Sequence, residues 1–237
     1  MFRVFPFSIL AVAILAAPAA QAYEAGDIIL RAGVAHVDPD SSSSRVNLDG
    51  AGPIPGWEVE VDSDTQLGLT GTYMLTPHIG LGLLASSPFK HDIEGAEALD
   101  GADLGETKHL PPTLTLQYFP MTSASRLQPY AGIGINYTHF FDEKTTPTLT
   151  GAVAGLAPDA GINATKLDLD DSVGLALELG LDFALTDHFG LNAAIWYVDI
   201  DTDATITAFA DGAEVATATS DVEIDPLVYM IGVSYRF

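Results

Sequence analysis

The 237-residue chain has no cysteine, few basic residues and almost no long apolar run. Because the chain has no cysteine, no disulfide can stabilise its fold. For the same reason, no lipid attached to a cysteine can anchor it to a membrane. Nine Lys and Arg stand against 32 Asp and Glu, and the net charge of −23 excludes nucleic acid as a partner. The most apolar stretch, residues 7–17, is too short for a membrane-spanning helix, which needs about 20 residues.

The N-terminus has the three parts of a secretory signal peptide. Arg3 is the positive start, residues 7–17 are the apolar core, and Ala20-Gln21-Ala22 fits the small-x-small cleavage site. We therefore expect residues 1–22 to be a signal peptide and residues 23–237 to be one exported domain. An exported chain without a spanning helix can enter a membrane only as a closed β-barrel, because lipid offers open strand edges no hydrogen bonds.

The end of the chain has the pattern of a strand that closes an outer-membrane barrel. From Leu227 to Phe237, bulky apolar residues alternate with smaller or polar ones such as Ser234 and Arg236. This period of two places one side of the strand against lipid and the other inside the barrel. We expect Tyr235 and Phe237 to be the signal that the barrel-assembly machinery reads. The alternative is an edge strand of a soluble barrel.

Alternation of apolar and polar residues predicts eight strands. They lie near residues 27–37, 65–75, 79–89, 113–119, 128–141, 172–186, 189–201 and 226–237. Short links and long acidic links alternate between them, as in outer-membrane proteins. The predicted fold class is therefore all-β: an eight-stranded antiparallel transmembrane β-barrel with short periplasmic turns and long extracellular loops.

Outward-facing aromatic residues support this layout, because they fall into two groups that flank an aliphatic band. Two aromatic belts are expected at the two edges of a bilayer. The periplasmic group is Tyr73, Tyr118, Phe183, Phe189, Tyr235 and Phe237, and the outer group is Phe89, Tyr137, Phe141, Tyr197 and Tyr229.

The negative charge is concentrated in the long links. Residues 38–64, 90–109, 142–172 and 199–225 hold 27 of the 32 carboxylates. Three interpretations stay open: solvated loop surface, adaptation to salty water, or sites where divalent cations bridge to lipopolysaccharide phosphates. We expect outer-membrane lipid and lipopolysaccharide among the partners.

Inward-facing positions of the periplasmic half carry polar and charged side chains. An eight-stranded barrel has room for little more than such side chains, and buried charges require partners. We predict a periplasmic plug that passes ions poorly, formed by Arg31, Gln117, Tyr130, Glu178, Asp182, Asn192 and Arg236. Paired carboxylates also serve acid–base catalysis, but no nucleophile or positioned histidine accompanies these, so we expect no enzyme.

Inward-facing positions of the outer half are apolar, whereas a porin lumen is polar. They predict a hydrophobic channel or, alternatively, ordinary core packing. The channel residues are Leu84, Pro88, Phe140, Trp196, Val198, Val228 and Met230. Pro88, Pro111 and Pro112 flank the loop between the third and fourth strands and cannot donate to the strand ladder. We predict a lateral exit there, through which an apolar solute reaches the bilayer without crossing the plug.

Segments in order along residues 23–237 resemble OmpW-like proteins. They are Glu24–Asp27, Leu30–Gly33, Thr65–Thr70, His109–Leu114, Gln128–Tyr137, Trp196–Thr202 and Tyr235–Phe237. The resemblance implies an eight-stranded outer-membrane barrel with an apolar channel at its outer end. It also implies a family thought to pass small hydrophobic molecules, some of them alkanes, through the barrel wall into the membrane.

We therefore expect an outer-membrane channel for small hydrophobic solutes. The alternative is a structural or interaction barrel whose acidic loops bind cations, lipopolysaccharide or host surfaces. We expect no cofactor and no metal. Gly132–Asn136 matches only part of a dinucleotide fingerprint and lies inside a strand. His91 and His109 flank one loop and could meet there, yet two ligands are too few for zinc. The oligomeric state is left open.

Overall fold

The computed structural model describes residues 23–48, 52–122 and 125–237, and the expected signal peptide lies outside them. Within these residues, eight antiparallel strands form a closed barrel, because the first strand pairs with the last. In order around the barrel they are β1 (Ile28–Asp38), β6 (Asp64–Thr76), β7 (Ile79–Ser86), β10 (Thr113–Tyr118), β11 (Leu127–Thr145), β13 (Ser172–Ala184), β14 (Phe189–Val198) and β17 (Leu227–Arg236). The predicted all-β fold, an eight-stranded antiparallel outer-membrane barrel, is confirmed.

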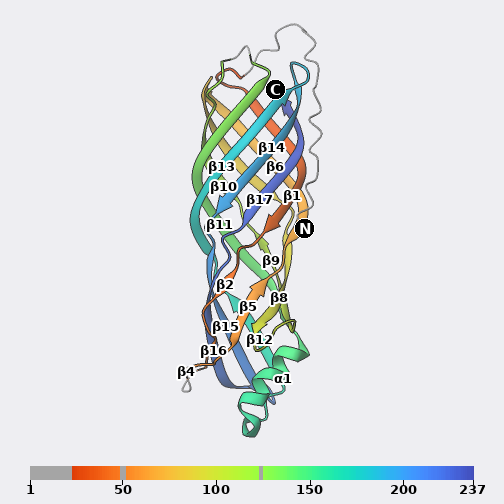
Figure 1. Cartoon of the computed structure of the whole chain (residues 1–237), viewed down its shortest axis with the longest axis vertical. Helices are drawn as coiled ribbons and strands as arrows, with labels where there is room; N and C mark the ends of the chain where they lie inside the picture. The colour runs from red at the N-terminus through yellow and green to blue at the C-terminus, as the bar shows by residue number, and fades with distance from the viewer. Residues whose placement is uncertain (1–22, 49–51, 123–124) are drawn as a thin grey trace, which may run out of the picture.

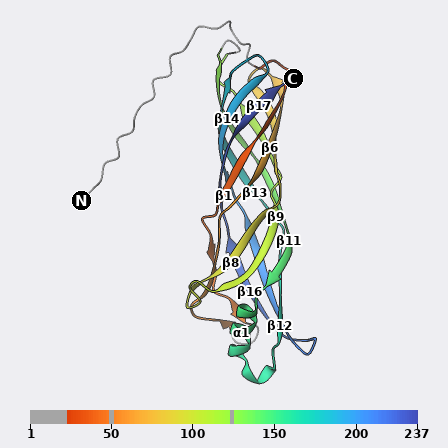
Figure 2. The same cartoon turned by 90° about the vertical axis from the view of Figure 1, so that its right-hand side faces the viewer.

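The long links fold into a second part that continues the barrel along its axis (Figures 1 and 2). One sheet extends from β11 to β9 (Asp103–Leu110), β8 (Phe89–Glu97) and β5 (Trp57–Val61), and another contains β12 (Ala164–Leu169), β15 (Asp201–Ala210), β16 (Ala213–Glu223), β2 (Ser42–Ser43), β3 (Asn47–Leu48) and β4 (Gly52–Pro53). Helix α1 (Pro147–Leu156) and the 3₁₀ turn η1 (Pro158–Ala160) complete this part. We call it the extracellular extension.

The extension corrects the expectation of long loops. Asp211 and Gly212 have φ of 51° and 84°, which suits a two-residue hairpin turn, so the acidic link 199–225 becomes the β15–β16 hairpin. Its Ile206 and Val222 point inward to a shared apolar cluster while the intervening carboxylates face water. No helix among the described residues is long and apolar enough to span a membrane.

The outer surface of the barrel is apolar, because alternate residues of each strand point away from the lumen. Leu69, Leu83, Ile133, Leu179 and Ile231 are each at least 46% exposed. Two aromatic belts border this band, as the alternation predicts. Among the exposed members are Tyr73, Tyr118, Phe183, Phe189 and Phe237 on the periplasmic side, and Tyr137, Tyr197 and Tyr229 on the outer side.

Two residues near the end of β7 face the opposite way from the prediction. Pro88 was expected inside and is exposed, whereas Phe89 was expected outside and is buried at 2% exposure. The strand breaks at Ser87 and Pro88, since proline has no N–H to give the ladder, and β8 restarts one residue out of phase. Pro88 therefore does not face the lumen with the other residues of the predicted channel.

Candidate functional site

In the periplasmic half of the lumen, hydrogen bonds converge on one carboxylate. Asp182 of β13 receives both Nε and Nη2 of Arg31, at 2.9 and 2.5 Å. The Tyr23 hydroxyl and the Asn192 amide donate to the same carboxylate at 2.6 and 2.8 Å. Four donors from three other segments satisfy a fully buried ion pair, which is the condition for such a pair to persist.

The network continues across the lumen from Arg31 to Glu178. Arg31 Nη1 donates to Thr72, Thr72 donates to Gln117, and Gln117 donates to Glu178, at 2.7, 2.8 and 2.8 Å. Thr115 also donates to Glu178, at 2.8 Å. Thr72, Thr115 and the N-terminal Tyr23 were missed from sequence, although Thr115 shares its inward face with Gln117 two residues on.

Glycines opposite the long side chains make room for this network. A Cβ at Gly180 would lie 2.1 Å from the Tyr130 ring, and one at Gly82 would lie 2.4 Å from Gln117 Nε2. The Tyr130 hydroxyl accepts a hydrogen bond from Asn192 at 3.1 Å. The structure thus brings together six of the seven predicted plug residues: Arg31, Gln117, Tyr130, Glu178, Asp182 and Asn192. The seventh, Arg236, is half-buried nearer the periplasmic end, 3.7 Å from Asp27.

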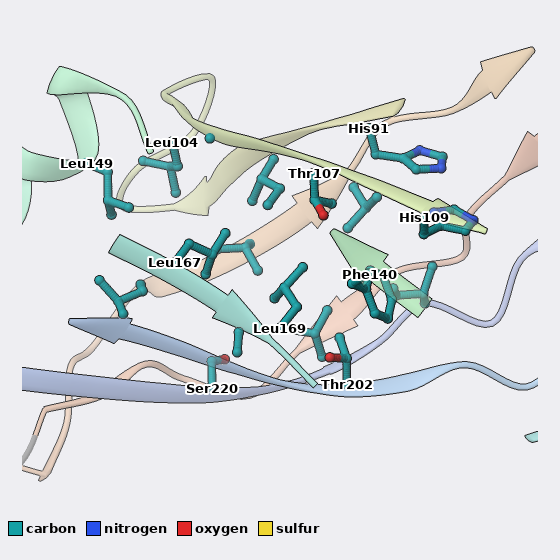
Figure 3. Close-up of a pocket in the computed structure, with 18 of the residues that line it drawn as sticks. His91, Leu104, Thr107, His109, Phe140, Leu149, Leu167, Leu169, Thr202 and Ser220 are labelled. Atoms are coloured by element: carbon teal, nitrogen blue, oxygen red, sulfur yellow. The ribbon is translucent and has the colours of Figure 1, made fainter. Parts of the chain in front are cut away.

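Above this network, the interior becomes apolar. An upper cavity within the extracellular extension has about 760 Å³ free of protein atoms, including the part that opens to solvent. Leu104 and Leu149 lie toward one end, and His91, His109 and Phe140 toward the other (Figure 3).

A lower cavity lies between the upper cavity and the barrel wall. Its lining includes Leu84, Pro111, Val198 and Val228, and it shares His109 with the upper cavity. The predicted channel residues other than Pro88 belong to one buried cluster: Leu84, Phe140, Trp196, Val198, Val228 and Met230. The structure therefore places six of the seven together.

The strand ladder is interrupted beside the lower cavity. The β7–β10 ladder ends at Leu84 and Thr113, and pairing resumes only at Phe89 and His109 of β8 and β9. Residues 85–88 and 110–112, which include the three prolines of the predicted exit, lie in this interruption. Asn136 was not predicted from sequence.

The side chain of Asn136, on β11, bonds to the β10 side of the interruption. Its amide donates to the carbonyl of Pro111 at 3.2 Å and to the hydroxyl of Thr113 at 2.9 Å. Its own carbonyl oxygen accepts from Thr138 at 2.7 Å, and the residue is completely buried. Asn136 thus ties residues 111–113 to β11, on the side away from residues 85–88.

His91 and His109 do meet, as a stacked pair in the extracellular extension. Their ring centroids are 4.8 Å apart and the planes differ by 8°. Burial lowers the pKa of His91, and burial together with the neighbouring His91 lowers the pKa of His109 to about 3. Both imidazoles are therefore neutral at neutral pH.

One group of carboxylates could hold a cation. Asp199, Asp201 and Asp225 place their oxygens within 4.8 Å of one another at the base of the extension. Exposed acidic groups often lie this close without an ion, so the predicted cation role of the acidic segments stays a prediction.

The comparisons with known proteins agree with this geometry. The model of the OmpW family matches residues 24–237. The chain belongs to the OmpW family. It is 44% identical over 218 residues to outer membrane protein W of Vibrio cholerae, covering 91% of each chain. The crystal structure of OprG from Pseudomonas aeruginosa is 47% identical, with a TM-score of 0.80 over 92% of this chain and 98% of that chain.

A more distant relative of this OmpW-family chain is the dibenzothiophene metabolism operon protein PahQ of Pseudomonas aeruginosa. It is 25% identical over 207 residues, which are 87% of each chain. Family membership confirms the resemblance and the outer-membrane location. The outer-membrane location also explains the exposed apolar surface of the barrel, because that surface faces lipid there.

Proposed function

We propose that this OmpW-family barrel is a passive channel for small hydrophobic molecules. A solute enters the upper cavity from outside, passes His109 into the lower cavity and leaves through the ladder interruption into the bilayer. The observation that carries this proposal is one buried apolar cluster above a buried polar network whose side chains hydrogen-bond to one another. An apolar solute gains from the first and is excluded by the second.

The ladder interruption supports a sideways route. Proline nitrogens at residues 88, 111 and 112 cannot pair across a strand gap, so opening the gap breaks few backbone hydrogen bonds. Pro111 lines the lower cavity, while Pro88 and Pro112 are exposed on the other side. The same residues thus border both the cavity and the outer surface.

The name of the relative PahQ fits an apolar solute. That protein is named for an operon of dibenzothiophene metabolism, and dibenzothiophene is an uncharged polycyclic compound. We propose the same chemical class, small uncharged apolar molecules, for this chain.

A matched pair of substitutions in β7 tests the proposal. Leu84 is 7% exposed and lines the lower cavity, whereas its neighbour Leu83 is 51% exposed and faces lipid. Leu84→Trp should slow the uptake of radiolabelled octane by cells that carry the protein, and Leu83→Trp should not. Equal uptake by the two variants, at equal amounts in the outer membrane, would overturn the channel.

The alternative function, an interaction barrel with acidic loops, has one observation in its favour. The carboxylates of Asp199, Asp201 and Asp225 converge at the base of the extension. In that case octane uptake would be unaffected by Leu84→Trp. Replacing the three carboxylates by amides would instead weaken the binding of divalent cations or lipopolysaccharide.

A further inference from the structure

Two polar atoms on the wall of the upper cavity have no hydrogen-bond partner among the residues that the structure describes. They are Nε2 of His91 and Nε2 of His109, on residues that are 2% and 4% exposed. The hydroxyls of Thr202 and Ser220 on the same wall donate to backbone carbonyls at 2.7 and 2.8 Å. The two imidazole Nε2 atoms therefore differ from these hydroxyls, which already have hydrogen-bond partners.

The hydrogen-bonding role of His91 is fixed by its second nitrogen. Nδ1 of His91 donates to the backbone carbonyl of Asp62, since a carbonyl can only accept. In the neutral ring, Nε2 must then be an acceptor. His109 offers a second buried Nε2, as donor or acceptor according to its tautomer. A buried acceptor left without a donor is unfavourable, so a ligand that supplies the donor is favoured.

The stacked geometry excludes a single metal ion shared by both rings. Each lone pair lies in its ring plane, and the two planes are nearly parallel with centroids 4.8 Å apart. Both lone pairs would have to converge on one point about 2.0–2.1 Å away to bind zinc. Parallel planes at this separation prevent that, and the rest of the wall offers aliphatic carbons, phenylalanine and hydroxyls.

We propose that His91 and His109 form a hydrogen-bonding subsite for solutes that join an apolar body to one hydroxyl group, such as medium-chain alcohols and phenols. The hydroxyl donates to Nε2 of His91, and it can also accept from or donate to His109. The apolar body lies along Leu167, Leu169 and Leu149 toward the far end of the cavity (Figure 3). This inference rests on the proposed function and adds to its apolar solutes a class that carries one hydroxyl group.

The test compares 1-octanol with its isomer heptyl methyl ether, which has the same atoms but no donor. The wild-type protein, with ¹⁵N-labelled histidine and ¹³C-labelled leucine methyls, is studied by NMR in lipid nanodiscs. Leucine methyl shifts of the cavity wall report occupancy, and the Nε2 shift of His91 reports hydrogen bonding. We expect 1-octanol to bind about threefold to tenfold more tightly than the ether, which corresponds to one added hydrogen bond.

Substitutions assign this preference to the pair. His91→Phe and His109→Phe keep an aromatic ring in the stack with Phe89 but remove the nitrogens. In His91→Phe the preference for 1-octanol should fall toward onefold, whereas in His109→Phe, which keeps the acceptor of His91, it should fall by a smaller factor. His139→Phe is the matched control, because His139 is exposed on the outside of the neighbouring strand β11 and should leave the preference unchanged.

The outcomes separate this inference from the channel. If both probes saturate the leucine shifts with equal affinity and the His91 Nε2 shift does not move, the subsite is wrong while the channel stands. If neither probe perturbs the cavity leucines, the channel itself fails, and the subsite fails with it.

Discussion

Glu178 and Trp196 are direct partners across the β13–β14 ladder, and both side chains point into the barrel. Glu178 accepts hydrogen bonds from Gln117 and Thr115 below the boundary, whereas Trp196 packs in the apolar cluster above it. One residue pair therefore marks the level at which the lumen changes from polar to apolar. In the proposed function, an apolar solute that enters from outside does not pass below this level.

The first prediction concerns the ion pair at the centre of the plug. Asp182→Ala leaves Arg31, whose side chain has 0% exposure, buried without its carboxylate. Breaking one half of a buried pair typically costs about 3–5 kcal/mol, so the free energy of unfolding should fall by that amount. Urea unfolding in lipid vesicles measures it. Asp187→Ala, in an exposed periplasmic turn, is the control and should change the value by less than about 0.5 kcal/mol.

The second prediction concerns ion conductance. A chain of hydrogen bonds crosses the periplasmic half of the lumen. It runs from Arg31 through Thr72 to Gln117, and from Gln117 to Glu178. Planar-bilayer recordings of the wild-type protein should therefore show small or no currents. Large, steady, porin-like currents would contradict a closed plug.

The third prediction concerns assembly. Phe237 is 64% exposed and directly follows the last strand, β17. Its N–H donates a hydrogen bond to the carbonyl of Ile28 in the first strand, β1. We propose that it is the assembly signal, so that Phe237→Ala lowers the amount of protein in the outer membrane severalfold. Tyr118→Ala removes another exposed aromatic residue of the same belt. Equal amounts of the two variants, measured in purified outer membranes, would remove the special role of Phe237.

The fourth prediction concerns the pH dependence of the extension, which lies outside the membrane span. An unfolded imidazole takes up a proton below a pH of about 6.5, whereas the lowered pKa of His109, about 3, keeps it neutral when folded. Between these values the unfolded form binds more protons, so stability is full above pH 6.5 and falls as the pH drops toward 3. Hydrogen-exchange protection of β8 and β9 should therefore be lower at pH 4.5 than at pH 7.

The double variant His91→Phe, His109→Phe checks the cause. It should lose most of this pH dependence, because the burial of two neutral imidazoles no longer contributes. His139→Phe should behave like the wild type. Unchanged pH dependence in the double variant would assign the effect to other groups, such as Asp64 near His91.

The barrel could be predicted from sequence because lipid imposes a strict period of two on every strand. A slip of one residue would turn polar side chains into lipid, so positions such as Leu83 and Leu179 determine the register. The same rule failed at Pro88 and Phe89. A proline break shifts the alternation of inward and outward residues, and the sequence alone does not show by how many residues it shifts.

The functional site was harder to predict than the barrel. Inward positions of regular strands, such as Asp182 and Trp196, followed from the alternation. Asn136 and Tyr23 did not, because their roles depend on partners distant in the chain: Pro111 for one and Asp182 for the other. The folded extension was missed for the same reason, as its strands pair segments far apart in sequence.

One engineered disulfide should close the proposed lateral exit. Ser86 and Pro111 both line the lower cavity, two residues beyond the last β7–β10 ladder pair on each strand. The natural chain has no cysteine, so Ser86→Cys with Pro111→Cys introduces a single possible bridge. Leu83→Cys with Leu114→Cys is the control, because this outward-facing pair lies inside the intact ladder.

The most direct measurement is the uptake of radiolabelled octane by cells that carry the Ser86→Cys, Pro111→Cys variant, before and after reduction. Thiol labelling confirms how much of the bridge has formed. The account predicts that the oxidised variant takes up octane at the rate of cells without the protein, that reduction restores uptake, and that the Leu83→Cys, Leu114→Cys control shows no such change. Full uptake with the bridge formed would contradict a lateral exit between β7 and β10.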